Sequence, residues 1–395
     1  MKIAVSSYTA TSALGHGVDS ILESIRTCQS GLRHNDLDGC DLDTWIGRVN
    51  GVESVAIPAH LADLQSRNNQ LTFLGLQQDG FLAKLDRLIA RVGSDRIGIV
   101  MATSTSNIGR TEEGYSKLDE SGLMPEAYQQ PEVHHLHGPG TFVSRLTGLT
   151  GPSLTISTAC SSSAKVFATA SRWIKQGVVD AVVVGAVDTL CLSVLYGFNS
   201  LELLSANPCR PFDQRRDGIS LAEAAGFALL TRGDLAPDAD VTLLGYGESS
   251  DAYHMSHPHP EGKGAMLAMT QALRRAQLAP TDIDYINLHG TASKANDLIE
   301  NLALDQLFST RTQASSTKGW TGHTLGTAGI LEAVITMEAM KHDLLPGTLN
   351  CDQPDPEFSF PILRENTTRP ARFAMTNSFG FGGNNATLVF GRAHD

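Results

Sequence analysis

Residues 153–175 (SLTISTACSSSAKVFATASRWIK) predict a short buried strand that runs directly into a helix. The strand covers residues 153–157, and the helix begins near residue 161 and ends before Gly177. Cys160 lies at the junction of the two elements. The helix has one apolar face, formed by Ala164, Phe167, Ala168 and Trp173. A strand that feeds a helix in this way is typical of α/β proteins.

The same alternation of apolar runs and amphipathic stretches continues along the chain. Besides an N-terminal strand at Ile3–Val5, the predicted strands are 96–102, 153–157, 180–187, 225–230, 241–244, 284–288 and 386–390. The other predicted helices are 265–277, 297–308 and an amphipathic helix at 328–341. A chain of 395 residues is expected to form two domains or two fused halves. The polar stretch 233–240 divides it into 1–240 and 241–395.

Composition excludes several classes of function. The formal net charge of −12 argues against a general nucleic-acid-binding protein, which needs a basic face. No apolar run is long enough to span a bilayer, and the N-terminus resembles a strand rather than a signal peptide. The six cysteines are scattered without C-x-x-C spacing, so no zinc knuckle is expected and a reducing cytoplasm fits best.

Two residues at strand ends are candidates for chemistry. Cys160 precedes a helix whose N-terminal dipole favours an anion, so its thiol is expected to ionise more easily. His289 follows the strand 284–288 at its carboxyl end, where α/β proteins place ligands. Each residue alone has a structural alternative, because a lone cysteine is usually a small buried side chain and a lone histidine a satisfied polar one.

Two Gly-rich segments complete the set of candidates. Residues 316–326 carry Lys318 and His323, but the lysine does not stand where a phosphate-binding loop requires it. Residues 377–385 could turn sharply and expose backbone N–H groups, as an oxyanion hole requires. A connecting loop and a hairpin turn are the alternatives for these two segments.

Together and in this order, these motifs resemble the β-ketoacyl synthase branch of the thiolase superfamily. Segments 209–218 (CRPFDQRRDG) and 249–255 (SSDAYHM) extend the resemblance over nearly the whole chain. The most similar group is the synthase I and II type of bacterial fatty acid synthesis, with its polyketide relatives. The resemblance implies a thiolase-like α/β fold of five layers, αβαβα, with two similar halves that usually form a dimer.

The resemblance also assigns roles at the expected site. Cys160 would carry the acyl group, and His289 and His323 would donate hydrogen bonds to the malonyl thioester oxygen. Lys318 and Glu332 would support these histidines. The backbone N–H groups of Cys160 and Phe381 would form the oxyanion hole, with the Phe381 side chain as a gate over the nucleophile.

The remaining implied residues contact the substrate arm or support the site. Thr291 and Ser293 would bind the pantetheine of an acyl carrier protein, and Asp297 and Glu300 match an acidic pair behind His289. The resemblance implies no metal and no resident cofactor, because the substrates arrive on phosphopantetheine. The chain departs from the usual pattern at several places, which are Ala222, Ala292, Asn384 and residues 134–140.

Three related classes of protein fit the sequence less well. A thiolase would need a second cysteine in residues 377–385, and a synthase of the III type would have an asparagine where His323 stands. A non-catalytic chain-length subunit would generally lack the nucleophile. The chain would therefore condense acyl and malonyl groups in fatty acid or polyketide synthesis, with an aryl polyene pathway as one alternative.

The expected partners are an acyl carrier protein and either a second copy of the chain or a related chain-length subunit. Because the carrier protein is acidic and this chain is also net negative, docking requires a local basic patch. Lys84, Arg87 and Arg91 recur at helical spacing with Arg67 nearby, and they are the candidates for this patch; a solvated helix face is the alternative for each of them.

Overall fold

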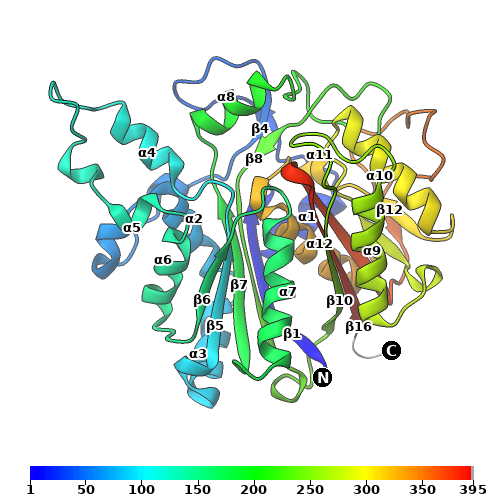
Figure 1. Cartoon of the computed structure of the whole chain (residues 1–395), viewed down its shortest axis with the longest axis horizontal. Coiled ribbons are helices and arrows are strands. Elements are labelled where there is room, and N and C mark those ends of the chain that lie inside the picture. The colour runs from blue at the N-terminus through cyan, green and yellow to red at the C-terminus, as the bar shows by residue number, and fades with distance from the viewer. Residues whose placement is uncertain (393–395) are drawn as a thin grey trace.

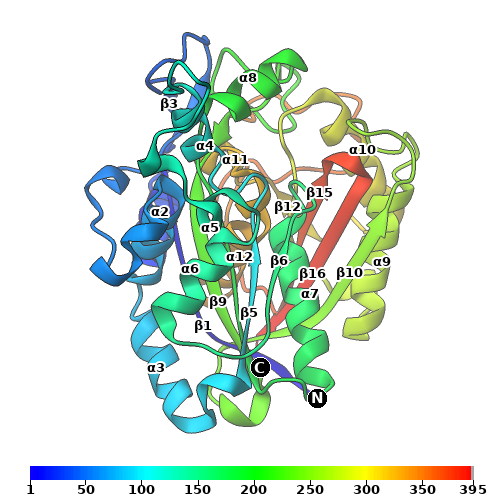
Figure 2. The ribbon, with the colours of Figure 1, turned by 60° about the vertical axis from the view of Figure 1, so that its left-hand side comes forward.

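Ten strands of the large sheet, within the described residues, form two groups of five that repeat the same order and the same directions. A computed structural model describes residues 1–392 (Figures 1 and 2). The first group runs in the order β6 (Ser153–Ile156), β5 (Ile97–Ala102), β7 (Ala181–Asp188), β9 (Ala224–Arg232) and β1 (Ile3–Ser12). The second runs in the order β12 (Gln313–Ser315), β11 (Tyr285–Asn287), β15 (Phe373–Gly380), β16 (Asn384–Arg392) and β10 (Val241–Ser250).

Each group has three parallel strands followed by two antiparallel ones. In the first group, β6, β5 and β7 are parallel and β9 and β1 are antiparallel to their neighbours. In the second group, β12, β11 and β15 correspond to the parallel strands, and β16 and β10 to the antiparallel ones. The groups join where Ile3–Val5 of β1 pairs with 241–243 of β10. The prediction of two similar halves is confirmed.

Helices separate the two groups of strands and cover their outer faces. Between the groups lie α7 (Ser162–Lys175) and α12 (Ala328–His342), which contact strands of both. The first outer face packs against α2 (Arg67–Leu76), α3 (Phe81–Val92) and α6 (Gly138–Thr147). The second packs against α9 (Lys263–Ala276) and α10 (Lys294–Leu307). These are the five layers expected of the thiolase-like fold.

Alternating side chains along the strands build the separate cores. On β5, Val100 points to the core that contains α7 and α12, whereas Ile99 and Met101 point to the outer core with α2 and α3. On β15, Ala374 and Met375 divide in the same way between the central core and the core with α9 and α10. Strands buried on both faces explain why their sequences are continuous apolar runs.

Helix α12 differs from its predicted amphipathic character. Every residue from Ala328 to Met340 is buried, because the helix lies between the two groups of strands and only Lys341 and His342 at its end are exposed. Its crossing with α7 is close, since a Cβ added at Gly329 would lie 2.7 Å from the backbone nitrogen of Ala164. The Ser163 hydroxyl also accepts a hydrogen bond from the Ile330 N–H at 2.9 Å.

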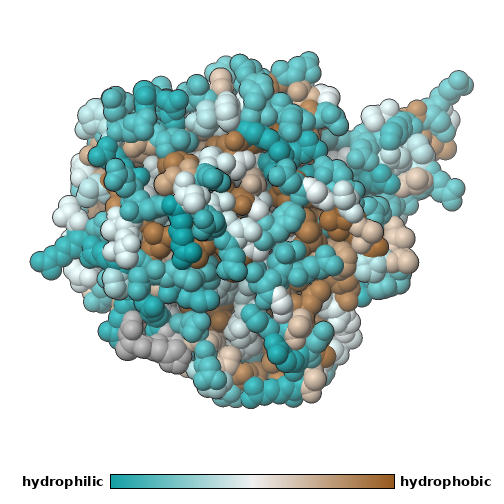
Figure 3. Space-filling model, turned by 180° about the vertical axis from the view of Figure 1, so that it is seen from behind, coloured by the Kyte–Doolittle hydropathy of each residue, from teal (hydrophilic) through white to brown (hydrophobic). Residues whose placement is uncertain are grey.

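Some predicted loops contain regular structure. Residues 377–380 belong to β15 and 384–385 to β16, so only Phe381–Gly383 forms the turn between them. Residues 104–140, for which no regular element is predicted, contain α4 (Ile108–Tyr115) and α5 (Pro131–His134). The segment between α4 and α5 projects from the body, and the surface seen from behind is mostly hydrophilic (Figures 1 and 3).

The remaining elements include α1 (Val18–Arg26), α8 (Leu192–Ser200) and α11 (Lys318–Thr321). A turn, η5 (Gly233–Leu235), and residues 236–240 connect β9 to β10. The division into domains 1–240 and 241–395 stays a prediction. Within residues 1–392 no helix is both long and apolar enough to cross a membrane.

Candidate active site

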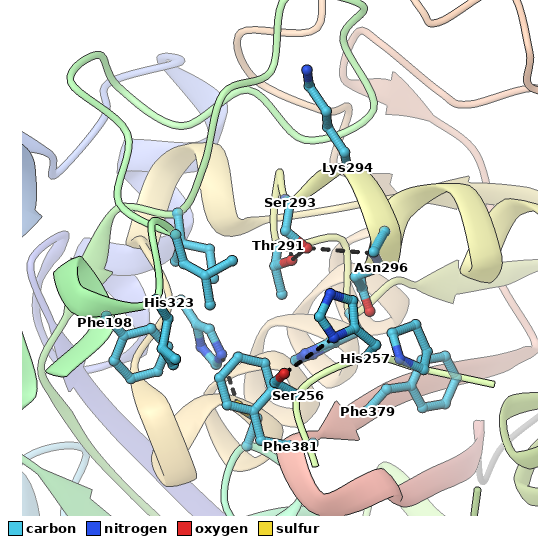
Figure 4. A pocket seen from close by; sticks show the side chains of 18 of the residues that line it. Phe198, Ser256, His257, Thr291, Ser293, Lys294, Asn296, His323, Phe379 and Phe381 are labelled. Atoms are coloured by element: carbon cyan, nitrogen blue, oxygen red, sulfur yellow. Dashed lines mark hydrogen bonds between the residues drawn. The ribbon is translucent and has the colours of Figure 1, made fainter. Parts of the chain in front are cut away.

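One pocket of about 500 Å³ brings together segments from both halves of the chain (Figure 4). Its lining comes from the start of α7, the end of α8, the loop 251–258, the start of α10 and the turn after β15. Cys160, His289 and His323 form its buried end. The structure therefore unites the three residues that the sequence proposes for the chemistry.

Cys160 sits on a strained connection between β6 and α7. Ala159 has a φ of 53°, a left-handed conformation that a non-glycine residue adopts at a cost. The turn leaves the thiol at the pocket, although only 6% of Cys160 is exposed. The backbone N–H groups of Cys160 and Phe381 both point at the sulfur. Two N–H donors therefore converge where an acyl oxygen would lie beside the nucleophile.

The expectation that this thiol ionises easily is wrong for the unloaded site. Burial raises the pKa of Cys160 to about 11, more than Lys318 and the two N–H groups lower it. The helix N-terminus is present as predicted, but the sequence does not reveal how little water reaches the sulfur.

Both histidines are held close to the sulfur and to each other. His323 Nε2 lies 3.0 Å from Cys160 Sγ, and the rings of His289 and His323 meet edge to face at 5.4 Å. Burial, followed by the charge of Lys318, lowers the pKa of both histidines well below the ordinary value. The two imidazoles are therefore neutral near pH 7 and can act as hydrogen-bond donors or acceptors.

Lys318 connects His289 to Glu332. Its ammonium forms an ion pair with the Glu332 carboxylate and donates a hydrogen bond of 2.5 Å to the His289 carbonyl. The same nitrogen lies 3.4 Å from His289 Nδ1. Because an ammonium can only donate, Nδ1 must accept, and the ring proton of neutral His289 then stands on Nε2.

The predicted acidic pair divides into two separate roles. The Glu300 carboxylate accepts the backbone N–H groups of His289 and Gly290 at 2.9 and 2.8 Å, so it fixes the turn that carries the histidine. Asp297 instead accepts the Phe212 N–H at 2.8 Å and lies 3.8 Å from Arg216 Nε. Burial raises the pKa of Glu300 to about 7.

Thr291 and Ser293 line the pocket wall, and their hydroxyls lie 2.9 Å apart (Figure 4). Ser293 also caps α10 by accepting the Asn296 N–H. Phe381 stacks on Phe198 of α8, with ring centroids 5.7 Å apart. No sequence pattern pairs these two phenylalanines, so the sequence does not predict the contact of Phe198 with Phe381.

Lys165 is a second residue that sequence reasoning missed. Its ammonium donates a hydrogen bond of 3.0 Å to the Asn384 side-chain oxygen, directly after the turn that contains Phe381. The departure from the family pattern at Asn384 was the available signal, because an amide there needs a polar partner.

The donor atoms of Cys160, His289 and His323 lie within 4.8 Å of one another. Cysteine and histidine are zinc ligands, so the geometry could hold a metal ion. The ammonium of Lys318 beside His289 opposes a cation there.

The residues of the expected docking patch lie away from the pocket lining, and the site of docking stays a prediction. Lys84, Arg87 and Arg91 lie on α3, at the end of the molecule opposite to α8 and α10, which border the pocket (Figures 1 and 2). Arg67 is paired with Glu53 and Glu223. The helical spacing correctly indicated that the three basic residues share one face of α3, but it does not indicate where in the molecule this helix packs.

The unusual segment 134–140 also lies outside the lining of this pocket. It packs on the loop after β5, where the Ser106 hydroxyl donates a hydrogen bond of 2.9 Å to the His135 carbonyl. His137 Nδ1 lies 2.7 Å from the Thr155 hydroxyl of β6.

Several known proteins are similar to this chain over nearly its whole length. The 3-oxoacyl-[acyl-carrier-protein] synthase 2 of Vibrio harveyi is 30% identical over 98% of both chains. A solved ketosynthase, ApeO of Xenorhabdus doucetiae in complex with its chain length factor ApeC, is 37% identical with a TM-score of 0.90, covering 99% of this chain and 98% of that one. A solved beta-ketoacyl synthase of Burkholderia phymatum is 27% identical with a TM-score of 0.88, covering 99% of both chains.

The family comparison divides the chain into two matched regions. Residues 1–236 match the N-terminal domain of beta-ketoacyl synthases, and residues 241–352 match the C-terminal domain. Because the two matches together span most of the sequence, the chain belongs to the β-ketoacyl synthase family.

Proposed function

We propose that this chain is an acyltransferase, a 3-oxoacyl-[acyl-carrier-protein] synthase that joins an acyl group to a malonyl unit with loss of carbon dioxide. The observation that carries the proposal is the thiol of Cys160, 3.0 Å from His323 Nε2 and beside His289 at the buried end of one pocket. A nucleophile with two neutral hydrogen-bonding groups suits a reaction in two stages.

In the first stage, Cys160 takes the acyl group from a carrier-protein thioester. His323 Nε2 accepts the thiol proton as the sulfur attacks the carbonyl, which compensates for the high pKa that burial gives the thiol. The N–H groups of Cys160 and Phe381 stabilise the oxyanion. The carbon–sulfur bond to pantetheine then breaks, and the leaving thiolate takes the proton from His323.

In the second stage, malonyl on a carrier protein enters the pocket. Its thioester oxygen accepts hydrogen bonds from Nε2–H of His289 and of His323 while the bond to the carboxylate breaks and carbon dioxide leaves. The first stage leaves the ring proton of His323 on Nδ1, which has no hydrogen-bond partner within residues 1–392, so no neighbour opposes the change to the tautomer with the proton on Nε2 that the second stage uses. The enolate carbon attacks the acyl thioester, and Cys160 leaves as a thiolate that solvent reprotonates.

The substrates are proposed to arrive on phosphopantetheine, along the wall that Thr291 and Ser293 form. The proposed reaction uses no resident metal or cofactor. Because all six cysteines are free thiols, we place it in a reducing cytoplasm.

A related chain-length subunit is the partner that we favour, because ApeO was solved with its chain length factor; a second copy is the other arrangement. The role of a non-catalytic partner subunit is less favoured, since Cys160, His289 and His323 converge. Whether the pathway makes fatty acids, polyketides or aryl polyenes stays a prediction.

Intact-mass analysis after incubation with a panel of acyl carrier proteins tests the proposal. The parent should gain one acyl group, Cys160→Ala should gain none, and the control Cys209→Ala should retain it because this buried thiol lies outside the pocket lining. An adduct of unchanged yield in Cys160→Ala would contradict the assignment. Absence of both an adduct and malonyl decarboxylation in the parent would favour the partner-subunit role.

A further inference from the structure

The solvent end of the pocket carries one lysine that the proposed reaction does not use. Lys294 follows Ser293, begins α10 and lines the pocket, and its side chain extends away from the buried end (Figure 4). Lys294 is exposed, whereas Cys160 and both histidines are buried. The lysine therefore marks the mouth through which a substrate arm would enter.

Lys294 has no carboxylate partner within residues 1–392, although carboxylates also line the pocket. Two of the three, Asp217 and Asp251, are engaged elsewhere, and the third, Glu202, forms no ion pair with Lys294 within residues 1–392. Asp217 accepts hydrogen bonds from Ser205 and Asn207, and Asp251 accepts them from the His259 N–H and the Asn385 amide. The ammonium at the mouth is thus available to an anionic ligand.

Helix stability does not explain this lysine. A cation at the first position of a helix opposes the helix dipole. Three helices of the described chain, α9, α10 and α11, begin with a lysine. Lys263 is paired with Glu261 and Lys318 with Glu332, which leaves Lys294 as the uncompensated member of the three.

We propose that Lys294 binds the phosphodiester of the phosphopantetheine arm. The inference rests on the proposed function, because it places the thioester at Cys160 and the arm beside Thr291 and Ser293. The phosphate is the only charged group of the arm and lies at the end remote from the thioester, so it reaches the mouth. There Lys294 is the one lysine or arginine that lines the pocket within residues 1–392, so it supplies the positive charge for an anionic group.

Two polar side chains of the loop 251–258 line the same pocket as Lys294. Ser256 and His257 line the same pocket, and the Ser256 hydroxyl lies 3.1 Å from His257 Nδ1 (Figure 4). A phosphate oxygen accepts hydrogen bonds from both a hydroxyl and an ammonium. The pocket lining therefore carries a hydroxyl donor as well as the Lys294 ammonium.

The test compares acyl transfer to Cys160 from two small thioesters that differ only in the phosphate, acyl-pantetheine and acyl-4′-phosphopantetheine. Intact mass measured over time gives kcat/KM for each, in the full chain with any partner subunit present. The parent should prefer the phosphorylated thioester by roughly tenfold, as expected for a charge-assisted hydrogen bond. Lys294→Met should lose this preference while acyl-pantetheine reacts at the parent rate.

The matched control is Lys263→Met, which removes an exposed lysine from the first position of α9, outside the pocket lining. It should keep the preference. An undiminished preference in Lys294→Met would overturn the inference. A third acyl donor, the acyl carrier protein, completes the comparison. If Lys294→Met lowered kcat/KM only for this donor, the inference would also be overturned, because Lys294 would then bind an acidic side chain of the carrier protein. Reaction of the parent with acyl-pantetheine supports the proposed function in either case, and failure with every thioester would overturn both.

Discussion

Replacing Lys318 with methionine should leave the Glu332 carboxylate buried without its cation. The two side chains are 1% and 2% exposed, and the ammonium also donates to the His289 carbonyl. Removing one member of a buried ion pair costs about 3–5 kcal/mol in free energy of unfolding. Lys318→Met should be destabilised by this amount at pH 8.

The loss of stability in Lys318→Met should depend on pH. Burial raises the pKa of Glu332 to about 7, and Lys318 is the main influence that lowers it. Without Lys318 the pKa of Glu332 rises further, so the folded variant keeps its proton where the folded parent loses it. The free energy of unfolding of the variant therefore decreases relative to that of the parent as pH rises through about 7. The difference between the two should be smaller at pH 6 than at pH 8.

A double variant separates stability from catalysis. Lys318→Met/Glu332→Met removes both charges with side chains of similar volume, which is often nearly neutral for a buried pair. It should recover at least half of the lost free energy. Malonyl decarboxylation should stay impaired, because His289 Nδ1 has still lost the donor that keeps its proton on Nε2.

Urea unfolding followed by tryptophan fluorescence measures the stability, since Trp320 is buried two residues from Lys318. Carbon dioxide release from malonyl carrier protein measures the decarboxylation. A double variant as unstable as Lys318→Met, or a deficit that does not change between pH 6 and 8, would refute the ion-pair argument. A double variant with full decarboxylation would refute the positioning of His289 by Lys318.

Three further predictions follow from the same site. Replacing either His289 or His323 with alanine should slow malonyl decarboxylation more than acyl loading, as isotope-labelled malonyl and intact mass would reveal; decarboxylation at the parent rate in both variants would contradict the assigned roles. Alkylation of Cys160 by iodoacetamide should rise roughly tenfold per pH unit between pH 7 and 9, because its pKa is about 11; a plateau below pH 8 would contradict that value. Glu300→Ala should lower the urea midpoint, because it leaves the N–H groups of His289 and Gly290 without their acceptor; an unchanged midpoint would show that water replaces the carboxylate.

Much of the fold was predictable because its signals are local. Continuous apolar runs identified β5, β7 and β16, and the strand-to-helix junction identified the setting of Cys160. β15 was missed, because its Gly-containing end resembles a turn and its strand character depends on pairing with β11 and β16. The motif order was enough to indicate the family and to select Cys160, His289 and His323.

The amino-acid sequence by itself determined which reactive side chains are present and in which order they occur, because neither depends on folding. Burial was decided only by the tertiary structure. The pKa of Cys160 depends on packing by both halves, and the burial of residues 328–340 of α12 depends on the second group of strands. The stacking of Phe198 on Phe381 and the position of α3 far from the pocket depend on how helices pack, which local periodicity does not encode. The spacing of apolar residues indicates which side chains share one face of a helix or strand. The segment that packs against that face is distant in the sequence, so the spacing does not identify it.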